Sequence, residues 1–138
     1  MDSSENAPRE EDSVLIVEDE SLVAQDLKGL VENLGFEVIG VEREGTAALT
    51  SIRRESPDLI LMDIMLAGEM DGIEVTRKLA ENPPPVVFLT AHTDAATLDR
   101  AKETNPLGYL TKPINEADLR TTLEVALQRK RTTKELHR

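Results

Sequence analysis

The sequence predicts a single α/β domain built on a parallel sheet that helices cover on both faces. Five short runs rich in apolar residues alternate with longer stretches of helical periodicity, which is the order of β-α units. The runs are continuous rather than alternating, as expected for strands that are buried on both faces. A length of 138 residues suits one domain with one sizeable core.

The five predicted strands are short and evenly distributed along the chain. They cover residues 14–17, 38–41, 59–62 and 86–89, with a weaker run at 107–110. Neighbouring parallel strands need a long crossover between them, and such crossovers are almost always right-handed. A helix is therefore expected between each strand and the next.

Apolar spacing and stop signals place the helices. The first has apolar residues at helical spacing and ends before Gly35; these residues are Val23, Leu27, Leu30, Val31 and Leu34. Proline positions end two further helices, expected over 46–55 and 72–81, and Thr93 or Asp94 caps a fourth over 94–103. The last helix carries Leu119, Leu123, Ala126 and Leu127.

Composition sets the domain limits and excludes several classes of function. Residues 1–12 are polar and acidic and are expected to form a flexible tail, with the domain over 13–130 and a C-terminal tail or linker over 131–138. The net charge of −11 opposes direct binding to nucleic acid or an anionic membrane. The chain has no cysteine and no long apolar run, so the cytoplasm is the expected location.

Polar residues gather where the predicted strands end. Glu18 and Asp19 close the first strand, Asp63 the third and Thr90 the fourth, and Lys112 follows the fifth. Ligands of open α/β sheets bind beyond the carboxyl ends of the strands, so these residues are expected at one rim.

Converging carboxylates at this rim call for a cation. Three such groups raise one another's pKa unless a positive ion lies among them, and Mg²⁺ favours a few carboxylates together with a phosphate. Lys112 and Thr90 could then bind two oxygens of a phosphoryl group carried by Asp63.

Each residue also has an ordinary interpretation. Asp63 alone could cap a loop, Thr90 could cap a helix, and Lys112 could be a solvated loop lysine. Glu18 and Asp19 could belong to the acidic first turn of a helix. The combination of these residues at four strand ends favours a phosphoacceptor site.

The residues now in view resemble the response-regulator receiver domain of two-component signalling. Its motifs match, in order, residues 14–20 (VLIVEDE), 57–64 (PDLILMDI), 70–74 (MDGIE), 89–92 (LTAH) and 109–113 (YLTKP). The resemblance implies a flavodoxin-like (βα)₅ sandwich with strand order 2-1-3-4-5. It also implies a signalling switch rather than an enzyme, phosphorylated by a sensor histidine kinase or a phosphotransfer protein.

The resemblance also assigns roles to residues. Asp63 would be the phosphoacceptor, and Mg²⁺, or Mn²⁺ in its place, would be bound by Glu18, Asp19, Asp63 and the Met65 backbone carbonyl. Thr90 and Lys112 would contact the phosphoryl group, with a cis bond before Pro113. Tyr109 would turn inward as Thr90 moves, although an ordinary strand position is equally open to it. The resemblance further implies a downstream effector, whose identity the sequence does not indicate. It also implies that a homodimer could form through the fourth helix, fifth strand and fifth helix.

Two departures and three rival functions stay open. The family most often has two aspartates where this chain has Glu18 and Asp19, and the loop at 66–72 is one residue longer and lacks a proline.

The first rival function is an aspartyl-phosphate phosphatase, which would need a second acid where Met65 stands. A flavodoxin-like cofactor binder would have its phosphate repelled by Glu18 and Asp19. The third rival is a degenerate receiver that binds partners without being phosphorylated.

Overall fold

A computed structural model describes residues 12–91 and 93–136, with side chains as far as residue 129. Its centre is one sheet of five parallel strands in the order β2-β1-β3-β4-β5, which confirms the expected fold and strand order. The strands are β1 (Ser13–Val17), β2 (Glu37–Glu42), β3 (Leu59–Asp63), β4 (Val86–Thr90) and β5 (Gly108–Thr111).

Five helices connect and follow the strands. They are α1 (Ser21–Asn33), α2 (Gly45–Glu55), α3 (Gly72–Arg77), α4 (Ala95–Lys102) and α5 (Glu116–Leu136). Of the two expected caps for α4, Asp94 is the one used, since its carboxylate accepts a hydrogen bond of 2.7 Å from the Thr97 amide. Gly35 follows α1 with a φ of 97°, which suits its expected role as a stop.

One helix end differs from the sequence prediction, and the structure adds detail at both ends of the domain. Helix α3 ends at Arg77 rather than 81, because the chain tightens into i→i−3 turns and Asn82 takes a left-handed φ of 57° ahead of the prolines. Helix α5 continues to Leu136, so most of the segment predicted as a tail or linker is helical. Asp12 is buried and its carbonyl accepts a hydrogen bond from Glu37, whereas residues 1–11 lie outside the described part.

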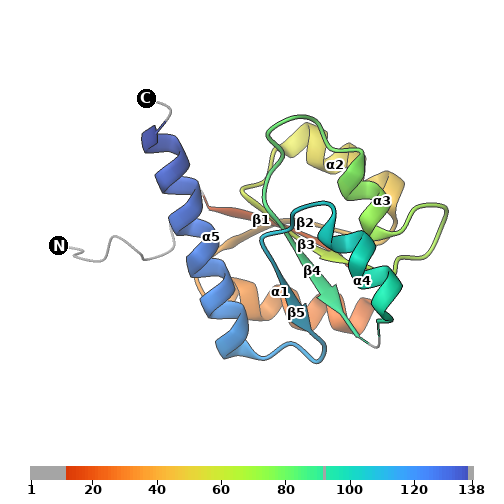
Figure 1. The fold of residues 1–138 in the computed structure, drawn as a ribbon. Helices are drawn as coiled ribbons and strands as arrows, with labels where there is room; N and C mark the ends of the chain where they lie inside the picture. The colour runs from red at the N-terminus through yellow and green to blue at the C-terminus, as the bar shows by residue number, and fades with distance from the viewer. Residues whose placement is uncertain (1–11, 92, 137–138) are drawn as a thin grey trace.

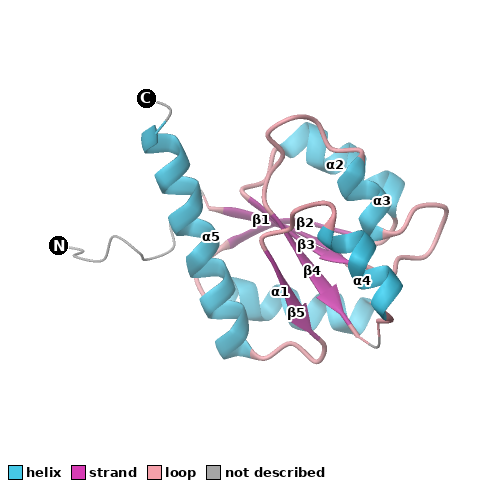
Figure 2. Ribbon diagram, in the orientation of Figure 1, coloured by secondary structure: helices cyan, strands magenta, loops and turns pink. Residues whose placement is uncertain are grey.

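Helices cover both faces of the sheet (Figures 1 and 2). On one face, α1 and α5 pack through Leu27, Val31, Leu119 and Leu123 against the inward side chains of the central strands. On the other face, α2, α3 and α4 contribute Ala48, Ile52, Ile73, Val75 and Ala101. Because helices lie against both faces of the sheet, the central strands β1, β3 and β4 are almost wholly buried, as their continuous apolar sequences require.

The sheet brings the carboxyl ends of its strands to one rim. Val17 pairs with Met62, Asp63 pairs with Leu89, and Thr90 pairs with Thr111, so the residues that follow each strand are neighbours across the sheet. In the described part of the chain, no helix has the length and apolar character that crossing a bilayer requires.

Gly72 offers a test of how closely the loop after β3 approaches the end of that strand. A Cβ at Gly72 would lie 2.1 Å from the carbonyl oxygen of Asp63, whereas a Cβ at Gly29 in α1 would meet nothing within 4 Å. We expect Gly72→Ala to lower the free energy of unfolding by about 1–3 kcal/mol or more through overpacking. Gly29→Ala should instead raise it by roughly 0.5–1 kcal/mol. Urea denaturation measures both, and equal effects of the two substitutions would contradict the close approach.

Candidate functional site

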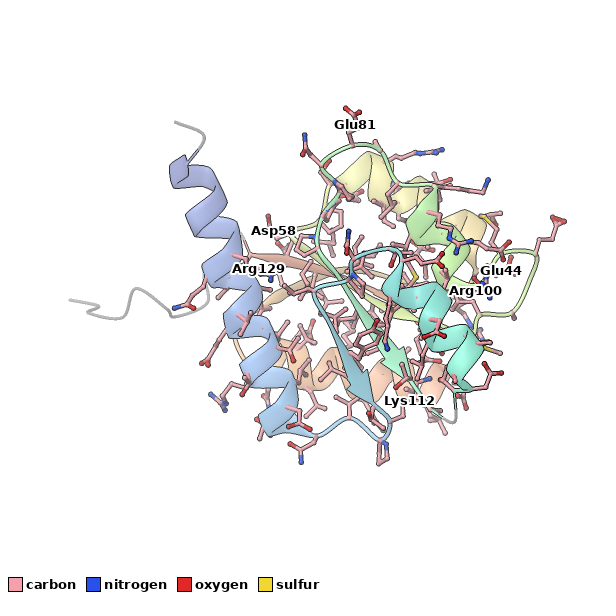
Figure 3. All side chains as sticks on the ribbon, in the orientation of Figure 1. Glu44, Asp58, Glu81, Arg100, Lys112 and Arg129 are labelled. Carbon is pink, nitrogen blue, oxygen red and sulfur yellow. The ribbon has the colours of Figure 1, made fainter. Side chains whose placement is uncertain are left out.

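The carboxyl rim of the sheet brings the predicted polar residues together. Figure 3 shows Lys112 near the heads of the strand arrows, whereas Asp58, which directly precedes β3, lies near their tails. An open pocket at this rim is lined by Asp19, Glu20, Asp63, Met65, Ala91, Thr93 and Lys112. Four separate loops therefore contribute to one hollow, as expected from the strand ends.

Asp63 lies at the centre of the rim, and both of its carboxylate oxygens have partners. It is the last residue of β3 and only 4% exposed. One oxygen, Oδ1, accepts a hydrogen bond of 3.0 Å from the Met65 amide, and Oδ2 lies 2.8 Å from the Lys112 ammonium. These partners fix the carboxylate in the lining of the pocket.

Glu18 is a fully buried carboxylate beside Asp63. Its Oε2 accepts a hydrogen bond of 3.1 Å from the Glu20 amide, and its Oε1 is 2.7 Å from the Lys112 ammonium. Oε1 thus has an ion-pair partner in Lys112, but it is the one buried side-chain oxygen among the described residues for which no hydrogen bond is found. Burial raises the pKa of Glu18 to about 7, Lys112 and the Glu20 amide oppose the rise, and Asp63 adds to it.

Lys112 is the cation that both carboxylates share. Its side chain is 15% exposed, and its ammonium also lies 4.0 Å from Glu20. Burial lowers the pKa of Lys112, but its close contacts with the negative charges of Asp63 and Glu18 outweigh burial and raise it. The backbone amide of Lys112 donates to the Thr90 carbonyl at 2.7 Å, and the bond to Pro113 is cis, as the resemblance implied.

Asp19 lies at the pocket wall and is held by groups that the sequence did not suggest. Its Oδ2 accepts a hydrogen bond of 3.1 Å from the Ala67 amide, and its backbone carbonyl accepts one of 3.1 Å from Arg43. The only signal for Arg43 was a basic residue directly after a strand in an acidic region. A backbone amide such as that of Ala67 leaves no signal in the sequence.

The acidic side chains fit a hard divalent cation. Glu18, Asp19 and Glu20 each offer a carboxylate oxygen, and these oxygens lie within 4.8 Å of one another. The buried Glu18 Oε1 forms an ion pair with Lys112 but no hydrogen bond, so it could also coordinate a cation. Glu20 was not among the predicted ligands, although the acidic run from Glu18 to Glu20 was visible in the sequence.

Thr90 is the last residue of β4 and Tyr109 lies within β5, as the sequence predicted. Thr90 is 8% exposed and is linked to Lys112 through its backbone carbonyl. Tyr109 is 38% exposed, and its ring centre is 6.2 Å from that of Phe88 on the neighbouring strand. Burial raises the pKa of Tyr109. The inward turn of Tyr109 stays a prediction.

The comparisons with known proteins agree with this geometry. Residues 14–124 match the family described as the response regulator receiver domain. The transcriptional regulatory protein PdtaR of Mycobacterium tuberculosis is 33% identical over 84% of this chain and 57% of its own length. The DNA-binding response regulator MtrA of the same species is 38% identical over 84% of this chain and 50% of its own length.

A solved structure shows the same fold over nearly its whole length. The signal receiver domain of a modulated diguanylate cyclase from Desulfovibrio desulfuricans G20 has a TM-score of 0.82 and 40% sequence identity. The match covers 88% of this chain and 97% of that domain. The present chain thus spans about half the length of the curated relatives above, but matches a single solved domain almost completely.

The charge balance at the rim yields a stability prediction. Two buried carboxylates share one lysine, so the cluster of Glu18, Asp63 and Lys112 carries a net negative charge once the pH exceeds the raised pKa of Glu18. In metal-free buffer above that pKa, we expect Glu18→Gln to raise the free energy of unfolding by about 1 kcal/mol, because it removes the excess buried charge. Urea denaturation in the presence of a chelator measures this change.

An exposed neighbour provides the matched control. Glu20→Gln removes the same charge from a side chain that is 69% exposed, and it should change stability by less than about 0.5 kcal/mol. A loss of stability in Glu18→Gln greater than that in Glu20→Gln would show that the ion pair with Lys112 outweighs the cost of burying Glu18.

Proposed function

This chain belongs to the response regulator receiver domain family of two-component systems, and we propose that it is a phosphorylation-operated switch in which Asp63 accepts the phosphoryl group. One observation supports this assignment above the others. Asp63 is a nearly buried carboxylate that lines an open pocket, with a lysine ammonium 2.8 Å away. An aspartate with that surrounding can act as a nucleophile whose product is stabilised by a positive charge.

The proposed reaction transfers a phosphoryl group from a phosphohistidine of a sensor kinase or phosphotransfer protein. A carboxylate oxygen of Asp63 forms a bond to phosphorus, the phosphorus–nitrogen bond of the phosphohistidine breaks, and the electron pair stays on the imidazole. The product is an acyl phosphate on Asp63. Lys112 already contacts Oδ2, so it can pair with a phosphoryl oxygen without a large movement.

The acidic side chains would bind Mg²⁺, or Mn²⁺ in its place. Glu18, Asp19, Asp63 and the Met65 backbone carbonyl are the proposed ligands, and Glu20 is close enough to take part. The bound ion supplies positive charge to the phosphoryl oxygens during transfer. The donor set fits because hard carboxylate and carbonyl oxygens are the ligands that Mg²⁺ prefers.

The conformational switch would arise from a change in the groups that the Lys112 ammonium contacts. In the unphosphorylated chain its ammonium contacts Asp63 and Glu18. A phosphoryl group on Asp63 adds negative charge that Lys112 and the Thr90 hydroxyl can satisfy only if they approach it. Because Lys112 is joined to Thr90 through the backbone, movement of one affects the other. Tyr109, next to Leu110 in β5, would follow Thr90 inward.

The remaining parts of the proposal concern partners and setting. We place the chain in the cytoplasm, with a sensor histidine kinase or phosphotransfer protein as donor and an unnamed effector as the recipient of the signal. The net charge of −11 favours protein partners with basic patches over nucleic acid. A homodimer through α4, β5 and α5 would use the surface that carries the exposed Tyr109 and Val125. Catalysis would be limited to assisting the chain's own phosphorylation and dephosphorylation.

Intact-mass analysis with acetyl phosphate and Mg²⁺ tests the assignment. We expect the wild type to gain the mass of one phosphoryl group, and Asp63→Asn or a chelated sample to gain none, because the nucleophile or the metal is missing. Asp94→Asn is the matched control, since asparagine caps α4 as well as aspartate does, and this variant should be phosphorylated like the wild type.

Two outcomes would contradict the assignment. Phosphorylation of Asp63→Asn would place the phosphoryl group on another residue. A folded wild type that is modified neither by acetyl phosphate nor by a panel of phosphorylated histidine kinases would favour a degenerate receiver.

A further inference from the structure

We propose that Arg43 is a positioning residue that holds Asp19 in place for the metal ion, an inference that rests on the proposed metal site. Arg43 directly follows β2 and is exposed. Its guanidinium donates a hydrogen bond of 3.1 Å to the backbone carbonyl of Asp19. Among the described residues, Arg43 has no ion-pair partner, and this hydrogen bond is the one polar contact found for its side chain.

The contact with Arg43 fixes the backbone of Asp19 without neutralising its carboxylate. A guanidinium that paired with the carboxylate would neutralise the ligand and compete with a metal ion. Arg43 binds the backbone carbonyl instead, so the Asp19 carboxylate keeps its negative charge. The side chain therefore restricts where Asp19 lies while leaving it able to coordinate a cation.

The residues on either side of Arg43 make equivalent contacts. The Glu42 carbonyl accepts a hydrogen bond of 2.9 Å from the Glu18 amide, and Glu44 forms an isolated parallel bridge with Ala67. Three consecutive residues, 42 to 44, thus connect the loop that carries the acidic ligands with the loop that follows Asp63. Figure 3 labels Glu44 on the side of the molecule where that second loop extends.

Ala67 completes the support of Asp19. Its amide donates to Asp19 Oδ2 at 3.1 Å, while Oδ1 has no hydrogen bond among the described residues. The carboxylate is therefore fixed at one oxygen and open at the other. Arg43 holds its backbone, and Ala67, itself held by Glu44, holds its side chain.

A purely electrostatic role for Arg43 predicts the opposite result of substitution. A positive charge near an acidic metal site repels a divalent cation, so removal of that charge alone should tighten Mg²⁺ binding. Loss of a positioning contact should weaken binding, because the ligand must then be ordered when the metal binds. The sign of the change in Mg²⁺ affinity separates the two roles.

The test is Mg²⁺ titration of the full unphosphorylated chain, by calorimetry or by NMR of backbone amides, at low and at high salt. We expect Arg43→Met, which has a similar length but neither charge nor donor, to bind Mg²⁺ about three- to tenfold more weakly, the range for one lost hydrogen bond. Arg43→Gln also lacks the charge but keeps a donor, and it should lie closer to the wild type. The weakening should persist at high salt, where exposed charges are screened.

Arg53→Met is the matched control. Arg53 is an exposed arginine in the last turn of α2, where its loss removes the same charge without touching Asp19. Its Mg²⁺ affinity should stay within about twofold of the wild type, as expected for a surface charge away from the site. In metal-free protein, the Asp19, Glu20 and Ala67 amide signals should shift in Arg43→Met and not in Arg53→Met.

The possible failures are distinguishable. Equal or tighter Mg²⁺ binding by Arg43→Met, with the wild type binding normally, would overturn the positioning role and leave the metal site intact. A wild type that binds no Mg²⁺ would overturn the metal part of the proposed function, and the positioning role with it. Thermal unfolding of each variant confirms that the comparison is made between folded proteins.

Discussion

The contact of one lysine with two buried carboxylates is the interaction on which the site depends. Glu18 follows β1, Asp63 ends β3, and Lys112 follows β5, so the three meet because β1 is paired with β3 and only β4 separates β3 from β5 in the sheet. A different strand order would leave two adjacent buried acids without a cation, at a cost of several kcal/mol. The chemistry of the rim and the order of the sheet are therefore linked.

The stability of the apolar core offsets the cost of burying charged groups at the rim. Burial raises the pKa of Glu18 and the neighbouring Asp63 adds to the rise, although Lys112 opposes it, and such an arrangement does not favour folding. The two apolar layers on either side of β1, β3 and β4 supply the opposing stability. The excess negative charge expected to weaken the metal-free protein would also attract the proposed cation, so stability and the proposed function would place opposite demands on Glu18.

Loops rather than strands fix the outer part of the site. Asp19 lies beyond β1 and is held by Arg43 from the loop after β2 and by Ala67 from the loop after β3. The longer loop at 66–72, a departure from the family pattern, thus supplies a contact to a proposed ligand. Gly72 lets this loop return close to the carbonyl of Asp63, which no larger residue could do without displacement.

Local signals in the sequence were enough to predict the α/β class and the polar residues at the centre of the rim, whereas the strand order came from the family resemblance. Continuous apolar runs marked β1, β3 and β4, and the residues that close them marked Glu18, Asp63 and Thr90. The end of α3, the continuation of α5 and the contacts of Arg43 and Ala67 with Asp19 became visible only in the folded chain. These contacts join residues 24 and 48 positions apart and use backbone atoms, which every residue possesses, so no residue type or spacing announces them.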